Sequence, residues 1–339
     1  MTDRILAVMK ARLREFYRDR AGLGWNLVMP LVFVVAFAVI FDEDANDVLK
    51  VGVLNGGHPV SASLQAYLGS RHINFVDFVD REEAIIKVRR HQLDLLLDLQ
   101  DQPSYWINQY SAKGEVAEKL LLAAFATPVD PPVRVEVEGR DIRYVDWVMP
   151  GILAMNMMFS CLWGVGWVVV RYRKNGVLRR LQATPLTAFE FVTAQVLSRL
   201  LTVTGVTLVV YLVAAISVDF TMRGSYLVLF LVFLSGAACL TGLGLLVATR
   251  IRSEELADGL LNVISWPMMI LSGVWFSLEG TTPAAQTVSA LFPLTHLVSA
   301  ARQVMLEGAG LSQVLGEIGL LLALTLGLLL LSARLFRWN

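Results

Sequence analysis

Long apolar segments alternate with short charged segments along most of the chain. Six of the apolar segments contain about 17–25 residues, which is enough to cross roughly 30 Å of hydrocarbon as a helix. They are Gly24–Phe41, Val145–Val170, Phe191–Ser217, Ser225–Thr249, Leu256–Ser277 and Ser312–Ala333. The pattern predicts an α-helical membrane protein with six transmembrane helices, followed by a tail at residues 334–339.

The N-terminal segment, residues 1–23, has a different pattern. Ile5, Met9, Leu13 and Phe16 recur at helical spacing, and basic residues occupy the opposite face. This amphipathic pattern predicts a helix lying in the cytoplasmic interface of the membrane, ahead of the first transmembrane helix at residues 24–41. A solvated basic tail is the simpler alternative.

Residues 42–144 interrupt the apolar pattern and predict an α/β domain inserted between the first two spans. Alternating and short apolar runs predict strands at Leu49–Asn55, Ile73–Val79, Leu93–Leu99, Ser104–Tyr110 and Val133–Gly139. Helices are expected at Val60–Leu68, Asp80–His91 and Ala112–Ala126, the second of them starting with a capping box of Asp80 and Glu83. About 100 residues are enough for an independent core.

The distribution of charge predicts the orientation in the membrane. The chain has 29 basic and 29 acidic residues, but the basic ones cluster on one side of the six-span layout. The clusters are Arg4, Lys10, Arg12, Arg14, Arg18 and Arg20; Arg171, Arg173, Lys174, Arg179 and Arg180; Arg250 and Arg252; and Arg334 and Arg337. Because the positive side of a membrane protein faces the cytoplasm, both termini are expected there and residues 42–144 are expected outside. We expect a multi-pass protein of the cell inner membrane.

The sequence lacks the usual motifs of nucleotide, metal and hydrolytic chemistry. It has no G-x-x-x-x-G-K-[ST] loop and no H-E-x-x-H or paired Cys/His spacing, and its four histidines are dispersed. Cys161 and Cys239 lie in expected spans, so no disulfide framework is expected. Gly164 and Gly166 are expected to allow close helix packing. We therefore expect no catalytic residue, metal site or cofactor in this chain, and no nucleic-acid partner.

A basic segment separates the second and third spans. Each charge at the bilayer centre costs about 2.5–3.5 kcal/mol on insertion scales, so Arg171 to Arg180 must protrude into the cytoplasm. Pro185 breaks the helical pattern, and Thr187 with Glu190 predicts a capping box for the next helix. The segment is either a short helix that binds a cytosolic partner or a positive loop without a partner.

The stretch after the fifth span contains apolar pieces too short to cross the bilayer. Pro283 and Pro293 interrupt it. We expect two short re-entrant helices within residues 280–308, because non-helical backbone at membrane depth is tolerated only inside protein or a wet cavity. An ordinary external loop is the alternative, but it would expose several leucines.

Four segments, in order, resemble the permeases of type 2 ABC exporters. RKNGVLRRLQATPL, from Arg173, is similar to the cytoplasmic signature of the family, with Val177 and Arg179 where Thr and Glu are commoner. VMPGILAM resembles the Pro-Gly start of the second span, SGVWFSLEGTTP the exit of the fifth, and LFPLTHLVSAARQVMLEG the re-entrant segment. Together the matches extend to residue 308 and cover essentially the whole chain.

This resemblance implies a transmembrane subunit that pairs with a second permease subunit, identical or not, and recruits a separate cytosolic ABC ATPase. ATP and Mg would then be bound by the ATPase, whose closure pushes a coupling helix at residues 174–187. The coupling residues are Lys174, Gly176, Val177, Leu178, Leu181, Thr184 and Pro185; the interfacial helix supplies Arg12, Phe16 and Arg18; and the re-entrant segment supplies Pro293, Thr295 and Arg302. Aspartates at Leu178 and Leu181 are expected to leave the protein inserted but to abolish transport. A periplasmic adaptor is left open.

The resemblance also implies a substrate path between the second and fifth spans. Its candidates are Asn156, Met157, Phe159, Ser160, Trp163, Asn262, Trp266, Met269 and Ser272. Packing against lipid or helices is the alternative for each of them. Met and aromatic side chains form an adaptable apolar surface, which suits a hydrophobic or amphipathic substrate such as a drug or a lipid.

Two ionisable residues lie inside expected spans. Arg199 is a functional-site hypothesis by default, with snorkelling to the interface or pairing with Glu254 or Glu255 as the structural alternatives. Glu317 is expected to be interfacial.

The leading functional hypothesis is the permease of an ATP-driven exporter. A membrane receptor or sensor with an external ligand-binding domain is the alternative, although the cytoplasmic segments between the spans are too short for an effector domain. An intramembrane enzyme ranks third, because no paired catalytic groups lie on facing spans.

Overall fold

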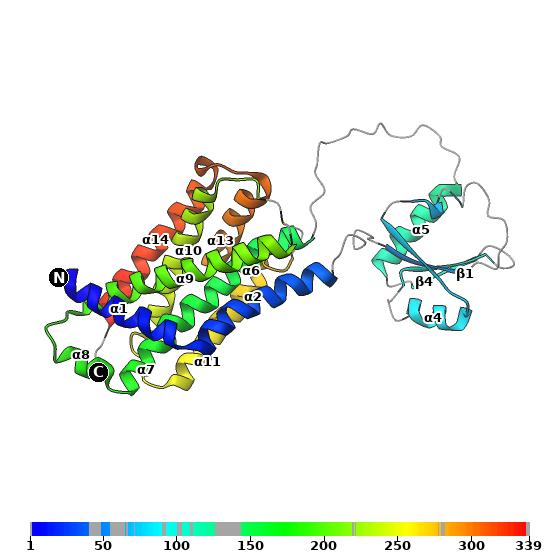
Figure 1. The fold of residues 1–339 in the computed structure, drawn as a ribbon. Helices are drawn as coiled ribbons and strands as arrows, with labels where there is room; N and C mark the ends of the chain where they lie inside the picture. Colours follow the sequence, from blue (N-terminus) through cyan, green and yellow to red (C-terminus); the bar gives the residue numbers. More distant parts are fainter. Residues whose placement is uncertain are drawn as a thin grey trace. The chain divides into compact units, whose positions relative to one another are not determined.

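The computed structural model divides the chain into two compact units, Met1–Ile40 with Ile142–Asn339 and Phe41–Asp141 (Figure 1). The structure describes residues 2–40, 49–54, 65, 67–70, 72–89, 93–99, 104–108, 111–125, 144–218, 220, 222–276, 278 and 282–336. The first unit is helical and the second holds a β-sheet.

The helical unit begins with two helices, α1 and α2, and continues after the inserted segment with a long bundle (Figure 1). Its elements are α1 (Thr2–Arg18), α2 (Arg20–Ile40), α6 (Tyr144–Cys161), the π-helical η2 (Leu162–Trp167), α7 (Val168–Lys174), α8 (Val177–Gln182), α9 (Ala188–Val218), α10 (Tyr226–Ala248), α11 (Glu254–Leu271), α12 (Pro283–Ala290), α13 (Pro293–Arg302), the π-helical η3 (Gln303–Glu307) and α14 (Leu311–Leu335).

Several of these helices have the length and composition of membrane spans. Within the described residues, four helical segments qualify, namely Tyr144–Lys174, Ala188–Val218, Tyr226–Ala248 and Leu311–Leu335, and a fifth is added if the bent pair Thr2–Arg18 and Gly22–Phe37 counts as one. The second span extends four residues further at its C-terminal end than expected, because α6, η2 and α7 run on to Lys174. The count of six spans stays a prediction.

The expected fifth span is shorter than the sequence pattern indicates. Helix α11 ends at Leu271, and the apolar residues up to Phe276 form a turn in which Gly273 has a φ of 69°. An L-residue rarely adopts this backbone conformation, so glycine ends the helix here although the apolar run continues. Helix α11 also begins with Glu254, Glu255 and Asp258, which makes its first turns polar.

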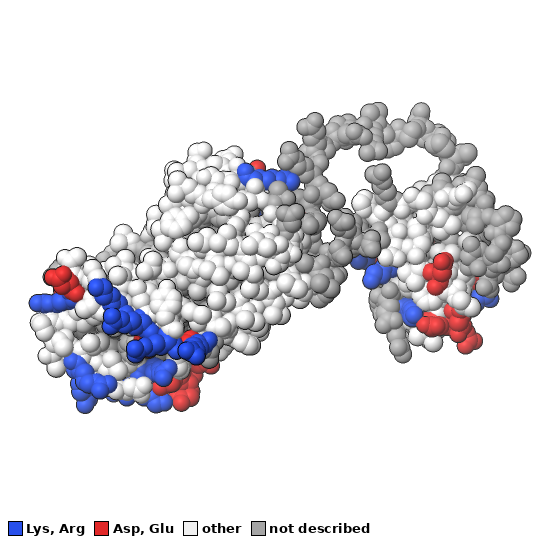
Figure 2. Space-filling model, in the orientation of Figure 1, with Lys and Arg blue, Asp and Glu red and all other residues white. Residues whose placement is uncertain are grey.

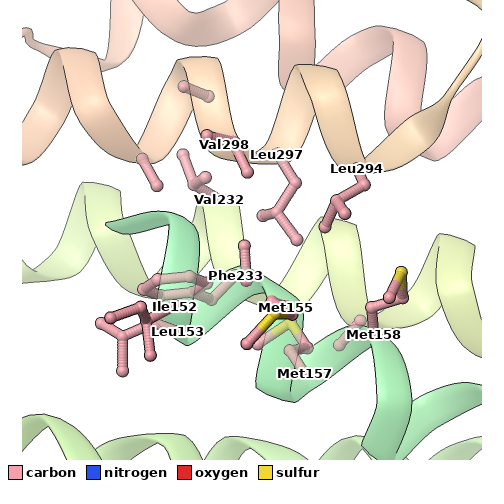
Figure 3. Close-up of a cluster of buried hydrophobic side chains, with 14 of the residues drawn as sticks. Ile152, Leu153, Met155, Met157, Met158, Val232, Phe233, Leu294, Leu297 and Val298 are labelled. Carbon is pink, nitrogen blue, oxygen red and sulfur yellow. The ribbon is translucent and has the colours of Figure 1, made fainter. Parts of the chain in front are cut away.

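The core of the helical unit is built from α6, α10 and α13. Met157 and Met158 of α6, Val232 of α10, and Leu294 and Leu297 of α13 are fully buried against one another (Figure 3). Because α13 contributes whole turns to this core, this part of the segment expected at residues 280–308 belongs to the bundle and is not an exposed loop.

Glycines permit the closest backbone contacts in this bundle. A Cβ on Gly166 of η2 would lie 3.0 Å from the carbonyl oxygen of Gly244 in α10, so Gly166 allows close helix packing as expected. A Cβ on Gly151 of α6 would lie 2.8 Å from the carbonyl oxygen of Val274. Both contacts are with backbone atoms, which cannot rotate away.

The Gly151 contact gives a first prediction. Gly151→Ala is expected to lower the thermal midpoint of the purified protein, because overpacking against a fixed backbone costs about 1–3 kcal/mol. Gly316→Ala, at a helical position of α14 with no atom within 4 Å, is the matched control and is expected to be neutral or stabilising. Equal midpoints for Gly151→Ala and wild type would contradict the close approach.

The second unit contains a four-stranded sheet of order β2-β1-β3-β4. Its elements are β1 (Leu49–Leu54), β2 (Ile73–Asp77), α4 (Arg81–Arg89), β3 (Leu95–Asp98), β4 (Ser104–Ile107) and α5 (Ala112–Phe125). Strand β1 pairs in parallel with β2 and β3, and β4 is antiparallel to β3. Each of these four strands lies within a range expected from the sequence.

Both faces of the central strands are covered. Leu95 and Leu97 contribute to a core with Ala117 and Leu121 of α5, whereas Leu96 packs on the other face with Ala84 of α4. This two-sided burial explains why β3 is a continuous apolar run. The expected strand at 133–139, and most of the expected helix at 60–68, lie outside the described residues.

The start of α4 differs in detail from the expected capping box. Asp80 accepts a hydrogen bond from the backbone N–H of Glu82 at 2.9 Å. Glu83 instead forms an ion pair with Lys87 at 2.7 Å, one turn further along the helix. The cap is therefore a single side-chain bond from Asp80.

Candidate functional site

A cavity of about 810 Å³ lies in the helical unit between α1, α2, α6, η2, α9 and α11. Six of the residues expected on the substrate path line it, namely Asn156, Phe159, Ser160, Trp163, Trp266 and Met269. The wall also includes Arg12 and Phe16 of α1; Trp25, Asn26, Met29, Pro30 and Phe33 of α2; Trp167 of η2; and Ser198, Arg199 and Thr202 of α9. The path candidates and the interfacial helix therefore share one cavity.

Four of the expected residues lie elsewhere. Met157 is fully buried in the core because it faces α10 and α13, and Ser272 is the C-cap residue of α11, bonded to Thr295. Asn262 is outside the cavity lining, and its amide donates to Asp258. Arg18 is exposed at the end of α1. Met157 and Asn262 were expected on the path through the family resemblance, which does not determine which side of each helix faces the cavity.

Sequence reasoning missed the contribution of α2. Asn26 lies inside an otherwise apolar segment, and its carbonyl oxygen accepts a hydrogen bond from the hydroxyl of Ser160 at 2.9 Å. Trp25, Met29 and Phe33 line the cavity on the same helix. A polar residue within the first apolar run was the signal that could have identified this face.

Arg199 is the centre of the polar part of the cavity. It is 8% exposed, and its Nη2 donates to the Ser160 hydroxyl at 2.7 Å. Of the alternatives from sequence, pairing with Glu254 or Glu255 is wrong, and snorkelling to the interface stays a prediction. Those two carboxylates instead lie 3.4 and 4.0 Å from the Lys174 ammonium.

The guanidinium of Arg199 lies directly against Gly164. A Cβ built on Gly164 would be 1.9 Å from the Arg199 Cζ atom, so only glycine leaves room for this side chain. Gly164 was expected to allow close helix packing, and it instead leaves space for the arginine side chain. Glu317 is half-buried near the start of α14, and its carboxylate accepts a hydrogen bond from the Gln303 amide at 3.5 Å.

Arg12 of α1 also contacts Gly164. Its Nη2 donates to the Gly164 carbonyl oxygen at 2.9 Å, and its Nη1 donates to Glu15 at 2.7 Å and to the Tyr172 hydroxyl at 2.8 Å. Helix α1 is therefore anchored to the second span by a charged side chain in addition to its apolar face.

The aromatic part of the wall is held by hydrogen bonds between helices. The indole N–H of Trp163 donates to Asp258 of α11 at 2.7 Å, and the rings of Phe159 and Trp163 are 5.5 Å apart. Arg171 lies over the ring of Trp167 at 5.3 Å. Phe159, Trp163, Trp167 and Arg171 all line the cavity, at intervals of four residues.

The basic segment forms the short helix α8, which begins after Gly176 at a φ of 68°. Arg179, Arg180, Gln182, Thr184 and Pro185 are exposed, whereas Val177 and Leu181 are half-buried. Leu178 is fully buried with residues of η2, α7, α9, α10 and α11. The apolar face of α8 therefore packs on its own chain at Leu178, which corrects the expectation that this leucine is available to a partner.

The capping box at the start of α9 is confirmed. The backbone N–H of Thr187 donates to Glu190 at 2.9 Å, and the backbone N–H of Glu190 donates to the Thr187 hydroxyl at 3.2 Å. Arg4 of α1 donates to the carbonyl oxygen of Pro185 and lies 3.8 Å from the Glu190 carboxylate. The end of the basic segment is thus attached to both α9 and α1.

Helix α7 connects this segment to the helices around the cavity. Arg173 donates to the carbonyl oxygens of Ala248 at 2.8 Å and of Thr249 at 3.1 Å, at the end of α10. Lys174 pairs with Glu254 at the start of α11. Helix α7 is therefore attached to the end of α10 and the start of α11.

Basic side chains gather at the end of the unit that carries α1, α7 and α8 (Figure 2). Exposed residues there include Arg14, Lys174, Arg179, Arg180 and Arg252. Residues from three charge clusters that are separate in sequence therefore share one surface.

The three residues expected in the re-entrant segment join α13 to its neighbours. Pro293 occupies the first turn of α13 and is buried, and the Thr295 hydroxyl contacts Ser272 at 3.0 Å and the Ser289 carbonyl oxygen at 2.7 Å. Arg302 donates to the Gly273 carbonyl oxygen at 2.9 Å and lies 3.7 Å from the centre of the Trp147 ring. They connect α11, α13 and the start of α6.

Comparisons with known proteins agree on one family. A family model described as "ABC-2 family transporter protein" matches residues 20–334. The chain is 24% identical over 341 residues to probable multidrug ABC transporter permease YbhS of Escherichia coli (strain K12), covering 90% of this chain and 89% of that relative.

Two further relatives are matched over part of their length. ABC transporter G family member 20 of Dictyostelium discoideum is 22% identical over 340 residues, which cover 90% of this chain and 46% of the relative. Inner membrane transport permease YhhJ of Escherichia coli (strain K12) is 26% identical over 204 residues, which cover 58% of this chain and 53% of the relative. The chain spans about half the length of these two relatives.

Proposed function

Since the chain belongs to the ABC-2 family of transporter proteins, we propose that it is the transmembrane subunit of an ATP-driven exporter of hydrophobic or amphipathic molecules. Two of its relatives are probable multidrug ABC transporter permeases, which supports this substrate class for the present chain. Hydrolysis of ATP would take place on a separate subunit that binds ATP and Mg.

The cavity is the observation that carries this proposal. Its volume of about 810 Å³ falls in the range of sites for small molecules. Tryptophan, phenylalanine and methionine side chains dominate the wall, and such side chains can repack around ligands of different shapes. A site of this kind favours amphipathic molecules over sugars or hydrated ions.

The surface around α8 is the proposed contact with the ATPase. Its exposed face is formed by Arg179, Arg180, Gln182, Thr184 and Pro185, while Leu178 anchors the helix in the core of its own chain. Contact with a moving ATPase would push α8, and Arg173 and Lys174 would carry the displacement to α10 and α11. Helix α11 forms part of the cavity wall.

The topology of the proposed exporter follows the sequence expectation. Six spans, with α2 and α11 as the first and fifth, place the basic end of the helical unit and both termini in the cytoplasm of a cell with an inner membrane. The sheet unit would then lie outside. A second permease subunit would complete the transporter, as the resemblance to the permeases of type 2 ABC exporters implies.

The direct test uses the full chain with its ATPase. The permease is co-expressed with a candidate ABC ATPase subunit, and ATP-dependent uptake of the neutral dye phenylnaphthylamine is followed in inside-out vesicles. Uptake is expected with wild type, and Phe159→Ala is expected to reduce it. Phe230→Ala, on the exposed face of α10, serves as the matched control. Dye binding without ATP-dependent uptake would instead favour a receptor.

A further inference from the structure

Arg199 is a buried cation without a counter-ion. No acidic side chain in the described part of the chain forms an ion pair with it, and its one hydrogen bond goes to the Ser160 hydroxyl. A buried charge is costly unless it is paired, and cations inside membrane proteins mark substrate pathways. The arrangement would be stabilised by an anion at the cavity wall.

The unsatisfied atoms of the cavity wall are all donors. Within the described residues, three buried nitrogen atoms on this wall lack a partner, namely Nε of Arg12, Nδ2 of Asn156 and Nε of Arg199. Buried polar atoms are normally hydrogen-bonded. Because these three nitrogen atoms have almost no accessible surface, they add positive potential to the wall, which favours an anionic ligand.

The charges of the wall leave one positive charge in excess. The wall contains three basic residues, Arg12, Arg171 and Arg199, and two acidic residues, Glu15 and Asp19. Glu15 already pairs with Arg12 at 2.7 Å, and Asp19 accepts the backbone N–H of Gly22 at 2.9 Å. Neither Arg171 nor Arg199 forms an ion pair in the described part of the chain, but Arg171 is exposed beside Trp167, so Arg199 supplies the buried uncompensated charge. Arg12 donates to the carbonyl oxygen of Gly164, against which the Arg199 guanidinium lies.

We propose that this cavity selects amphipathic anions, whose carboxylate, sulfate, sulfonate or phosphate group is bound by Arg199 and flanked by Arg12. The apolar body of the ligand packs on the aromatic row of Phe159 and Trp163 and on Trp25 of α2. The inference deepens the proposed export function and rests on it, because it names the substrate class of the same site.

The test uses two fluorescent probes with the same aromatic skeleton. Anilinonaphthalenesulfonate carries a sulfonate, and phenylnaphthylamine is neutral. Each is titrated against the full chain in phosphatidylcholine nanodiscs, and the signal from empty discs is subtracted. Wild type is expected to bind the sulfonate about tenfold more tightly than the neutral probe, as a charge-assisted hydrogen bond supplies that factor. Equal affinities would overturn the proposal.

Three variants assign the preference to the arginine. Arg199→Gln is expected to weaken the sulfonate by about tenfold and to leave the neutral probe within about twofold, and Arg199→Lys is expected to keep the preference. Arg334→Gln, an exposed basic position on α14, is the matched control and should change neither affinity. Equal losses for both probes in Arg199→Gln would contradict anion binding.

Two further arms complete the design. If Arg199→Gln fails to fold, Arg12→Gln replaces it and must weaken the binding of the sulfonate selectively, or the proposal fails.

Phosphatidylglycerol in the discs lowers sulfonate affinity for wild type, but not for Arg199→Gln, if the anion comes from the membrane. It has no such selective effect if the anion is a soluble amphiphile. Binding needs no ATPase, so loss of the preference with intact dye export refutes the inference alone.

Discussion

Replacing Leu178 with Asp is expected to prevent the helical unit from folding, and not merely to uncouple it from an ATPase. Leu178 is fully buried among residues of five neighbouring elements. Loss of a buried leucine costs about 2–5 kcal/mol, and an unpaired carboxylate in the same place adds further cost. The change is measured as loss of the monodisperse peak in size-exclusion chromatography of the detergent-solubilised protein.

Two matched variants separate burial from charge. Leu178→Met conserves volume and is expected to cost less than about 1.5 kcal/mol, and Leu181→Asp, at a half-buried position, is expected to leave the protein folded. A monodisperse Leu178→Asp protein with the wild-type thermal midpoint would show that this side chain is not part of the core. The double aspartate variant suggested by the sequence alone therefore cannot report on coupling.

Reversing the exposed charges of α8 is expected to abolish ATP-dependent transport while the protein stays folded. Arg179→Glu with Arg180→Glu alters two side chains that are exposed and outside the core. Exposed substitutions usually change stability by less than about 0.5 kcal/mol, whereas like charges across an interface cost several kcal/mol. ATPase co-purification and dye-stimulated hydrolysis are the measurements, and both are expected to fall at least tenfold.

The control reverses two other exposed charges at the same end of the unit. Arg250→Glu with Arg252→Glu changes the net charge equally but lies between α10 and α11. If this pair abolishes ATPase binding as strongly, the effect is a general attraction to the basic surface and α8 is not the specific contact. If neither pair has an effect, the proposed coupling segment is wrong.

Much of the architecture could be predicted because it follows from the periodicity of apolar residues and the distribution of charge. The spans follow from long runs of apolar residues, the strands from alternating or short apolar runs, and the capping box of Thr187 and Glu190 from its spacing. Helix ends were less certain where an apolar run outlasts the helix. Leu271 ends α11 because of the backbone at Gly273, and hydropathy carries no information about backbone angles.

The cavity was only partly predictable. Asn156, Phe159 and Ser160 were identified through a resemblance, but the partners of Arg199 depend on which helices meet in three dimensions. Nothing in the sequence pairs Arg199 with Ser160, or gives Gly164 the role of making room for a guanidinium. Leu178 was misjudged for the same reason, since amphipathicity shows that a face is apolar but not what covers it.

The π-helical turn at Leu162–Trp167 determines which side chains of the second span form a continuous stack. In an α-helix of 3.6 residues per turn, a spacing of four drifts around the axis by about 40° at each step. The wider π turn takes up this drift, so Phe159, Trp163, Trp167 and Arg171 remain on one side. The alignment of these four side chains, from the middle of the span to its basic end, thus depends on helical register as much as on residue identity. Deleting Val165 from the turn would rotate the residues that follow it by about 100° around the helix axis. The four side chains would then no longer lie on one side, although all of them would still be present.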